Sequence, residues 1–87
     1  MPCIKIINIG RGNQNEYILE SDAVSSNHAL LLVGAGTQHL LIDKNSANGT
    51  RVAGVNDGER ITQKMVTNVE KIYFGDVACM VGDILRN

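Results

Sequence analysis

Short runs of apolar or alternating residues follow one another along the whole chain, and small polar clusters separate them. Eight runs have the length and composition of β-strands, and they cover residues 3–9, 16–20, 28–34, 39–43, 50–55, 59–62, 70–75 and 77–82. The clusters between them are rich in Gly, Asn, Asp and Ser, which favour turns because Gly and Asn tolerate positive φ and the polar side chains bond nearby backbone. Residues 61–74 also fit a short amphipathic turn, but their Thr and Val content favours a strand followed by a loop.

Strands this short and this regularly spaced predict an all-β fold, an antiparallel sandwich or barrel. The chain has no long linker, internal repeat or low-complexity tract, so we expect one domain over residues 1–87. Residues 34–40 (GAGTQHL) and 55–61 (VNDGERI) are typical of hairpin connections, and the Asp57-Gly58 pair is a strong turn signal.

The composition narrows the classes of function. The chain is 44% hydrophobic and 20% charged, as in an ordinary globular protein. No apolar run approaches the roughly 18 residues of a membrane span, and the N-terminal residues lack the pattern of a signal peptide. The formal net charge is −1, the basic residues are scattered singly, and Tyr17, Tyr73 and Phe74 are the only aromatic residues. We therefore expect neither membrane insertion nor nucleic-acid binding.

Two cysteines, Cys3 and Cys79, lie 76 positions apart. Small secreted domains usually carry several disulfides, so this pair favours two buried thiols in a reducing, cytoplasmic compartment. A single disulfide between the terminal strands stays open as the alternative.

Ser25 and His28, with Asp43 downstream, raise the question of nucleophilic catalysis. No G-x-S-x-G elbow surrounds the serine, and 87 residues leave little room for an oxyanion hole and a substrate cleft. The candidate metal ligands are Cys3, His28, His39 and Cys79. They lack the close paired spacing that zinc ligands show in sequence. We expect no enzyme activity, no metal and no cofactor.

Three long polar loops, at residues 10–15, 20–27 and 44–49, exceed what turns require. Loops on a rigid sandwich are where binding residues tend to lie. The loops hold a guanidinium that suits phosphate and several hydroxyl and amide donors, namely Arg11, Ser25, Ser26, Asn27 and Asn48. Taken singly, Arg11 is explained as an exposed, solvated arginine, and residues 46–50 are explained as a plain turn. Hydrogen-bond donors from separate loops, gathered at one end of a sandwich, instead favour an anion-binding site.

Five segments, in order, resemble the forkhead-associated (FHA) domain, a module that recognises phosphothreonine peptides. They are IGRG (9–12), SSNHA (25–29), DKNSANGTRVAG (43–54), GERI (58–61) and IYFGD (72–76). The resemblance implies a two-sheet antiparallel β-sandwich of about 11 short strands, SMAD/FHA-like, with the binding loops at one end.

The resemblance also assigns residues. It implies that Arg11 and Ser25 bind the phosphate, that Ser26 contacts the phosphopeptide, and that Asn48 holds the peptide backbone or a neighbouring loop. Four further residues would support the site, namely Gly10, His28, Gly49 and Thr50.

Three positions depart from the family pattern. Ser26 stands where arginine or asparagine is more usual, and Ala47 where some members have threonine. Ala53 replaces an asparagine often found before the last glycine of its segment.

The function predicted on this basis is non-enzymatic binding of a phosphothreonine protein or peptide, in one part of a larger signalling protein. It implies a Ser/Thr kinase upstream. The departures at Ser26 and Ala47 motivate the alternative, a phospho-independent interaction or assembly domain of the same fold.

Overall fold

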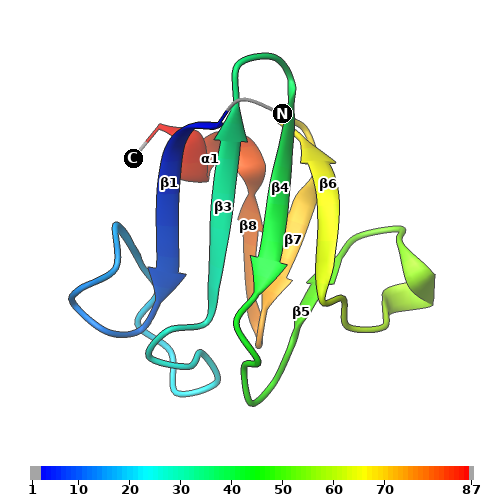
Figure 1. Ribbon diagram of the computed structural model, residues 1–87. Coiled ribbons are helices and arrows are strands. Elements are labelled where there is room, and N and C mark those ends of the chain that lie inside the picture. Colours follow the sequence, from blue (N-terminus) through cyan, green and yellow to red (C-terminus); the bar gives the residue numbers. More distant parts are fainter. Residues whose placement is uncertain (1–2, 87) are drawn as a thin grey trace.

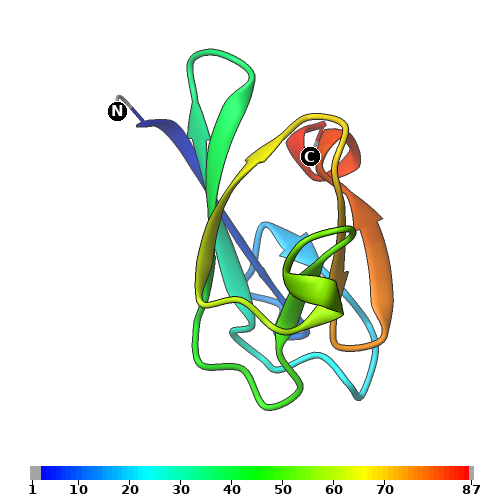
Figure 2. The ribbon, with the colours of Figure 1, turned by 90° about the vertical axis from the view of Figure 1, so that its right-hand side faces the viewer.

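The computed structural model describes residues 3–86 as two β-sheets packed face to face (Figures 1 and 2). The strands are β1 (Cys3–Gly10), β2 (Tyr17–Ile18), β3 (Ala29–Gly34), β4 (Gln38–Asp43), β5 (Thr50–Val52), β6 (Gln63–Thr67), β7 (Lys71–Phe74) and β8 (Val77–Met80). A 3₁₀ turn, η1 (Asn56–Gly58), and a short helix, α1 (Val81–Leu85), complete it. The predicted all-β sandwich is confirmed, with eight strands in the described residues rather than about eleven.

The larger sheet has the order β2-β1-β3-β4-β6 and the smaller one the order β5-β7-β8. All neighbours pair antiparallel except β1 and β2, which pair parallel over two residues. The predicted hairpin at residues 34–40 is confirmed, because it joins β3 to β4 with Leu32 opposite Leu40.

The core lies between the sheets and is made of side chains from both inner faces. Ile7, Leu31 and Leu41 of the larger sheet and Ile72 and Phe74 of the smaller one are fully buried. This burial is the main stabilising contribution to a domain of this size.

The segment 59–62, which the sequence predicts as a strand, joins no ladder. The Ile61 N–H donates to the Thr50 carbonyl in the smaller sheet, and the Thr62 carbonyl accepts from the Asp43 N–H in the larger one. The segment therefore passes from one sheet to the other with single hydrogen bonds to each. The strand that follows is β6, which lies within residues 61–74, the region predicted as a strand followed by a loop. For the same reason the Asp57-Gly58 turn is not a hairpin, since β5 and β6 belong to different sheets.

The last predicted strand, residues 77–82, ends early because the chain turns into α1 at Val81. Val81 and Ile84, three positions apart on one side of this helix, are both fully buried. Neither helical segment of the described chain is long enough to cross a bilayer.

Cys79 is a free, buried cysteine, so it does not form the disulfide left open above. The Cys3 side chain lies outside the described part of the chain. Burial raises the pKa of the Cys79 thiol and also that of Tyr17, whose hydroxyl it contacts. The thiol is therefore held in its protonated, unreactive form.

Candidate functional site

The three polar loops lie together at one end of the sandwich, below β1, β3 and β4 in Figure 1. The first connects β1 to β2, the second connects β2 to β3, and the third connects β4 to β5. The turn between β7 and β8 reaches the same end (Figure 1). This end therefore gathers every residue that the sequence places at the site.

Backbone hydrogen bonds join the first loop to the second. The Arg11 N–H donates to the Ser25 carbonyl at 2.9 Å, and the Gly12 N–H donates to the Ser26 carbonyl at 3.1 Å. Gly10 allows this approach, because a Cβ on it would lie 2.3 Å from the Ser26 carbonyl oxygen. Arg11 is thereby held beside both serines.

Asn15 strengthens this junction from below. Its buried amide donates to the Gly12 carbonyl at 2.8 Å and to the Ser26 carbonyl at 2.7 Å. The Gln14 amide also donates to Asn27 Oδ1 at 2.6 Å. The sequence reasoning missed both residues, since within GRGNQN they have the composition of any polar turn.

His28 is fully buried and connects the second loop to the third. Its Nδ1 accepts from the Ser25 N–H at 3.1 Å, and its Nε2 lies 2.9 Å from the Gly49 carbonyl oxygen, to which it donates. The ring also packs edge-on against Phe74, with centroids 5.8 Å apart. Since both ring nitrogens are occupied, His28 is no base for the Ser25 hydroxyl, and the catalytic interpretation has no geometric support.

Asp43 organises the third loop. Its Oδ1 accepts from the Thr50 hydroxyl at 2.7 Å and from the Ser46 hydroxyl, and its Oδ2 accepts from the Ser46 N–H at 3.1 Å. Burial by itself raises the pKa of this carboxyl, but the hydrogen bonds from Ser46 and Thr50, together with His28 nearby, outweigh it and lower the pKa. Asp43 is thus held ionised.

Arg60 closes the other side of this loop, and the sequence reasoning missed it as well. Its Nη2 donates to the Ser46 carbonyl at 2.8 Å and lies 3.6 Å from Asp43 Oδ2. Its side chain covers Gly49, which has φ +87° and where a Cβ would meet the Arg60 Nε at 3.0 Å. The loop conformation therefore depends on glycine at this position.

The second and third loops also meet through two side chains of the predicted site. The Ser25 hydroxyl oxygen accepts from the Ala47 N–H at 3.1 Å, and the Asn48 amide donates to the Ala23 carbonyl at 2.8 Å. The turn between β7 and β8 supports them from behind, because Gly75 approaches Ala23 so closely that a Cβ would lie 2.4 Å from its carbonyl oxygen.

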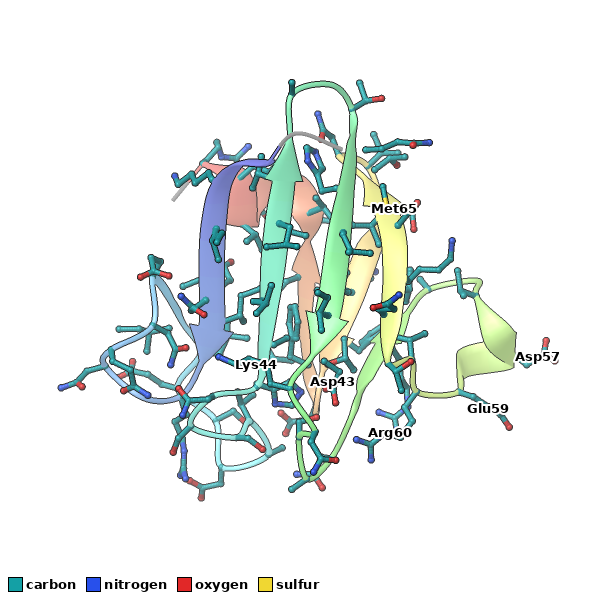
Figure 3. The ribbon with its side chains drawn as sticks, viewed as in Figure 1. Asp43, Lys44, Asp57, Glu59, Arg60 and Met65 are labelled. Carbon is teal, nitrogen blue, oxygen red and sulfur yellow. The ribbon has the colours of Figure 1, made fainter. Side chains whose placement is uncertain are left out.

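Two groups are left facing solvent between these anchors. The Arg11 side chain is about half exposed, and its Nη1 lies 3.2 Å from Oδ1 of Asp22, a fully exposed carboxylate. The Ser26 hydroxyl is exposed and has no hydrogen-bond partner among the described residues. Lys44 and Arg60 lie at the same end (Figure 3), together with the carboxylates of Asp22 and Asp43, so this end carries charges of both signs.

Among the described residues, no group of three or more His, Cys, Asp or Glu side chains is placed to hold a metal ion. His28 and His39 lie at opposite ends of the sandwich, since His39 Nδ1 accepts from the Gly34 N–H beside the β3–β4 hairpin. The site is thus one of hydrogen-bond donors on cross-linked loops.

A two-sheet sandwich with cross-linked polar loops at one end defines a β-sandwich module of the kind that presents loops for interaction. The family model of the FHA domain matches residues 7–75, so the chain belongs to the FHA domain family. Members of this family are interaction modules and are generally not enzymes.

Solved structures are similar over most of the chain. The FHA domain of the CT664 protein from Chlamydia trachomatis has a TM-score of 0.76 at 22% identity, over 90% of this chain and 76% of that one. The FhaA FHA domain, solved in complex with the intracellular domain of Rv3910, has a TM-score of 0.76 at 25% identity, over 92% and 82%. Mycobacterium tuberculosis EmbR, solved with a low affinity phosphopeptide, has a TM-score of 0.73 at 26% identity, over 86% and 19%. No curated protein sequence matches the chain.

Proposed function

We propose that this FHA domain binds phosphothreonine peptides, and that Arg11, Ser25, Ser26 and Asn48 make the contacts. The observation that carries the proposal is the half-exposed Arg11 guanidinium, held next to Ser25 and Ser26 by two backbone hydrogen bonds. A similar chain, EmbR, has been solved with a phosphopeptide, which supports the same ligand class here.

The donors have the chemistry that a phosphate dianion needs. The Arg11 guanidinium offers a planar fork of N–H donors, which binds phosphate oxygens in pairs. The Ser25 oxygen already accepts from the Ala47 N–H, so its own proton is directed elsewhere and is available to a phosphate. The exposed Ser26 hydroxyl adds a neutral donor, which is shorter than the arginine or asparagine more usual there.

Asn48 is suited to the peptide backbone rather than to the phosphate. Its amide nitrogen donates to the Ala23 carbonyl, which fixes the side chain and leaves the Oδ1 acceptor exposed. An exposed acceptor of this kind binds a peptide N–H, so Asn48 would position the chain next to the phosphorylated residue. Ala47 contributes through its N–H, which holds Ser25.

The proposal extends to the setting of the domain. We infer a non-enzymatic recognition module acting in the cytoplasm as one part of a larger signalling protein, downstream of a Ser/Thr kinase. The free, buried Cys79 thiol is consistent with a reducing compartment.

Binding of matched peptides tests the function. A phosphothreonine peptide chosen from an oriented library is expected to bind at least about 30-fold more tightly than its unphosphorylated twin, because two or three charge-assisted hydrogen bonds are each worth roughly 1.5–3 kcal/mol. Isothermal titration calorimetry of both peptides, with a phosphoserine peptide as a third ligand, measures the difference. The threonine methyl alone contributes only about 0.8 kcal/mol if it is simply buried. Equal affinity for the phosphorylated and bare peptides would instead favour the phospho-independent interaction domain.

Asp22 competes with phosphate for Arg11, so the Asp22→Asn variant is expected to bind the phosphothreonine peptide more tightly. Exposed ion pairs are worth about 0.2–1 kcal/mol, which corresponds to a gain of roughly 1.5–5-fold at low salt. Calorimetric titration at low ionic strength checks it, with Asp57→Asn as the control, since this variant loses the same charge on the η1 turn (Figure 3). Weaker or unchanged binding by the Asp22 variant would contradict the competition.

A further inference from the structure

The larger sheet carries aliphatic side chains on its outer face as well as on its inner one. The outer face comprises the side chains of β1, β3, β4 and β6 that point away from the smaller sheet, toward the viewer in Figure 3. The strand register places eight of them in two rows across the four strands. The first row is Ile6, Leu32, Leu40 and Met65, and the second is Asn8, Leu30, Ile42 and Gln63. Six of the eight are apolar, with Ile6 54% and Met65 36% exposed.

The two central strands have the sequence of a sheet that is covered on both sides. A sheet with one solvated face alternates apolar and polar residues, whereas continuous apolar runs indicate burial of both faces. β3 contains the unbroken run 29–33 and β4 the run 40–42, and their inward-facing members already fill the core. The outward-facing members, Leu30, Leu32, Leu40 and Ile42, are partly exposed. A contiguous apolar patch of this kind marks an interaction site.

The outer face carries no charge within its two rows. At the hairpin end the next pair is Gln38 and Thr67, which is also uncharged. The charged groups at its border include Glu16, which accepts from Asn8, and Lys44 at the loop end (Figure 3). Two more are Lys64, which donates to the Met65 carbonyl, and the exposed Lys5 next to Ile6. Within its two rows the surface offers no charge to a charged partner, but it meets a copy of itself there without like-charge repulsion.

In each of the two rows, the order of apolar and amide side chains is the same from β1 to β6 as from β6 to β1. The first row is apolar throughout, and the second has an amide at each end and two aliphatic residues between them. A two-fold axis parallel to the strands, between β3 and β4, would put Leu32 against Leu40 of the second copy and Asn8 against Gln63. Because Asn8 Nδ2 already donates to Glu16, its Oδ1 is the acceptor for the Gln63 amide. An axis across the strands would instead put both amides against apolar side chains.

We propose that the outer face is the interface of a weak, two-fold symmetric homodimer. Two such faces would stack as aligned sheets, in which strand directions stay within about 30° of each other. Four strands of this length would bury about 1,000 Å² in total, the lower limit for a specific interface. An interface at this limit is a weak one, so the dimer is expected to form only at high micromolar protein concentrations.

An axis parallel to the strands keeps both loop clusters at the same end of the dimer. If the function proposed above holds, the dimer presents two phosphothreonine sites side by side, and a doubly phosphorylated partner gains affinity from the second contact. The interface leaves these loops uncovered, so dimerisation and phosphopeptide binding can fail independently of each other.

Sedimentation equilibrium of the 87-residue chain tests the proposal. The mass is expected to rise from 9.4 kDa toward twice that value between about 5 µM and 500 µM protein. The Leu32→Glu and Leu40→Lys variants should each stay monomeric, with dissociation constants raised at least about 30-fold, because each buries an unpaired charge against apolar side chains.

Mixing the two variants is expected to restore a dimer, since the new carboxylate and ammonium then face each other. Val69→Lys is the matched control, because it puts a charge on an apolar residue that is 79% exposed outside this face.

A monomer at all concentrations up to about 1 mM would overturn the proposal and leave the face to a different partner. The proposal would also be overturned if the Leu32→Glu or Leu40→Lys variant dimerised with the dissociation constant of the wild type. The same holds if a mixture of the two variants stayed monomeric. Should these variants fail to fold, amide chemical shifts of the wild-type chain in a concentration series decide instead. Changes confined to residues 6–8, 30–32, 40–42 and 63–65 support the dimer, and changes confined to the loops overturn it.

Discussion

The Arg11→Ala variant is expected to lose about 2–3 kcal/mol of binding free energy for the phosphothreonine peptide, which is roughly 30–150-fold in affinity. The loss follows from removing a guanidinium that is half exposed and whose side-chain hydrogen bond and ion pair, among the described residues, are with Asp22. Affinity for the unphosphorylated peptide should stay unchanged, because the backbone hydrogen bonds of residues 11 and 12 to the second loop do not need the side chain.

Two further variants separate charge from geometry. Arg11→Lys keeps the charge but loses the planar fork, so an intermediate affinity is expected. Arg86→Ala removes the same charge from the residue that follows α1, at the end opposite the loops, where Arg86 pairs with Asp83. Calorimetry on all three variants with both peptides provides the comparison. If Arg86→Ala weakens phosphopeptide binding as much as Arg11→Ala does, the effect is one of net charge and Arg11 is not a phosphate ligand.

The parts of the fold that follow from local pattern were predictable from the sequence. Alternating or apolar runs gave β1, β3, β4 and β7, and the turn residues between them gave the loops, because both signals depend on neighbours in the chain. The segment 59–62 was predicted wrongly as a strand because its composition is that of a strand. Its conformation is decided by long-range hydrogen bonds to Thr50 and Asp43, which belong to different sheets.

The site divides in the same way. Arg11, Ser25 and Asn48 were predicted as site residues from short motifs, and the structure brings their loops together. Asn15 and Arg60 were missed because their importance lies in which carbonyl oxygens they reach, and that depends on how the loops fold back. The apolar outer face was also not predicted. A run such as ALLLV identifies a buried strand, but it does not say that no other part of the described residues 3–86 covers the strand's second face.

Asp43→Asn is expected to have the largest effect on stability, lowering the free energy of unfolding by about 2–4 kcal/mol at neutral pH. Only 5% of the Asp43 side chain is exposed, and its two oxygens accept from Ser46, in two places, and from Thr50. An amide in the same position turns one acceptor into a donor. That donor then faces either the hydroxyls of Ser46 and Thr50 or the Ser46 N–H and Arg60.

The pH dependence of this effect has a defined sign. The pKa of Asp43 is lowered in the folded protein from its ordinary value of 3.8, so folding favours the ionised form. Its stabilisation is complete above the unfolded pKa and is lost as the pH falls through the lower, folded pKa. The difference in stability between wild type and Asp43→Asn should therefore be largest at neutral pH and shrink below about pH 4. Urea unfolding at pH 7, 5 and 3 measures it, and a difference that stays constant over this range would contradict an ionised Asp43.

The same variant links the stability of the third loop to binding. Asp43 holds Ser46, and the next residue, Ala47, donates to the Ser25 oxygen, so a loosened third loop releases the proposed phosphate ligand. Asp43→Asn is thus expected to weaken phosphopeptide binding several-fold at a temperature where the variant is still folded, although Asp43 lies beneath the loop and contacts no peptide. The Asp57→Asn control, which removes an exposed carboxylate on the η1 turn, should change neither stability nor affinity. A variant that loses stability but binds the phosphopeptide with wild-type affinity would show that Ser25 keeps its position without the Asp43 network.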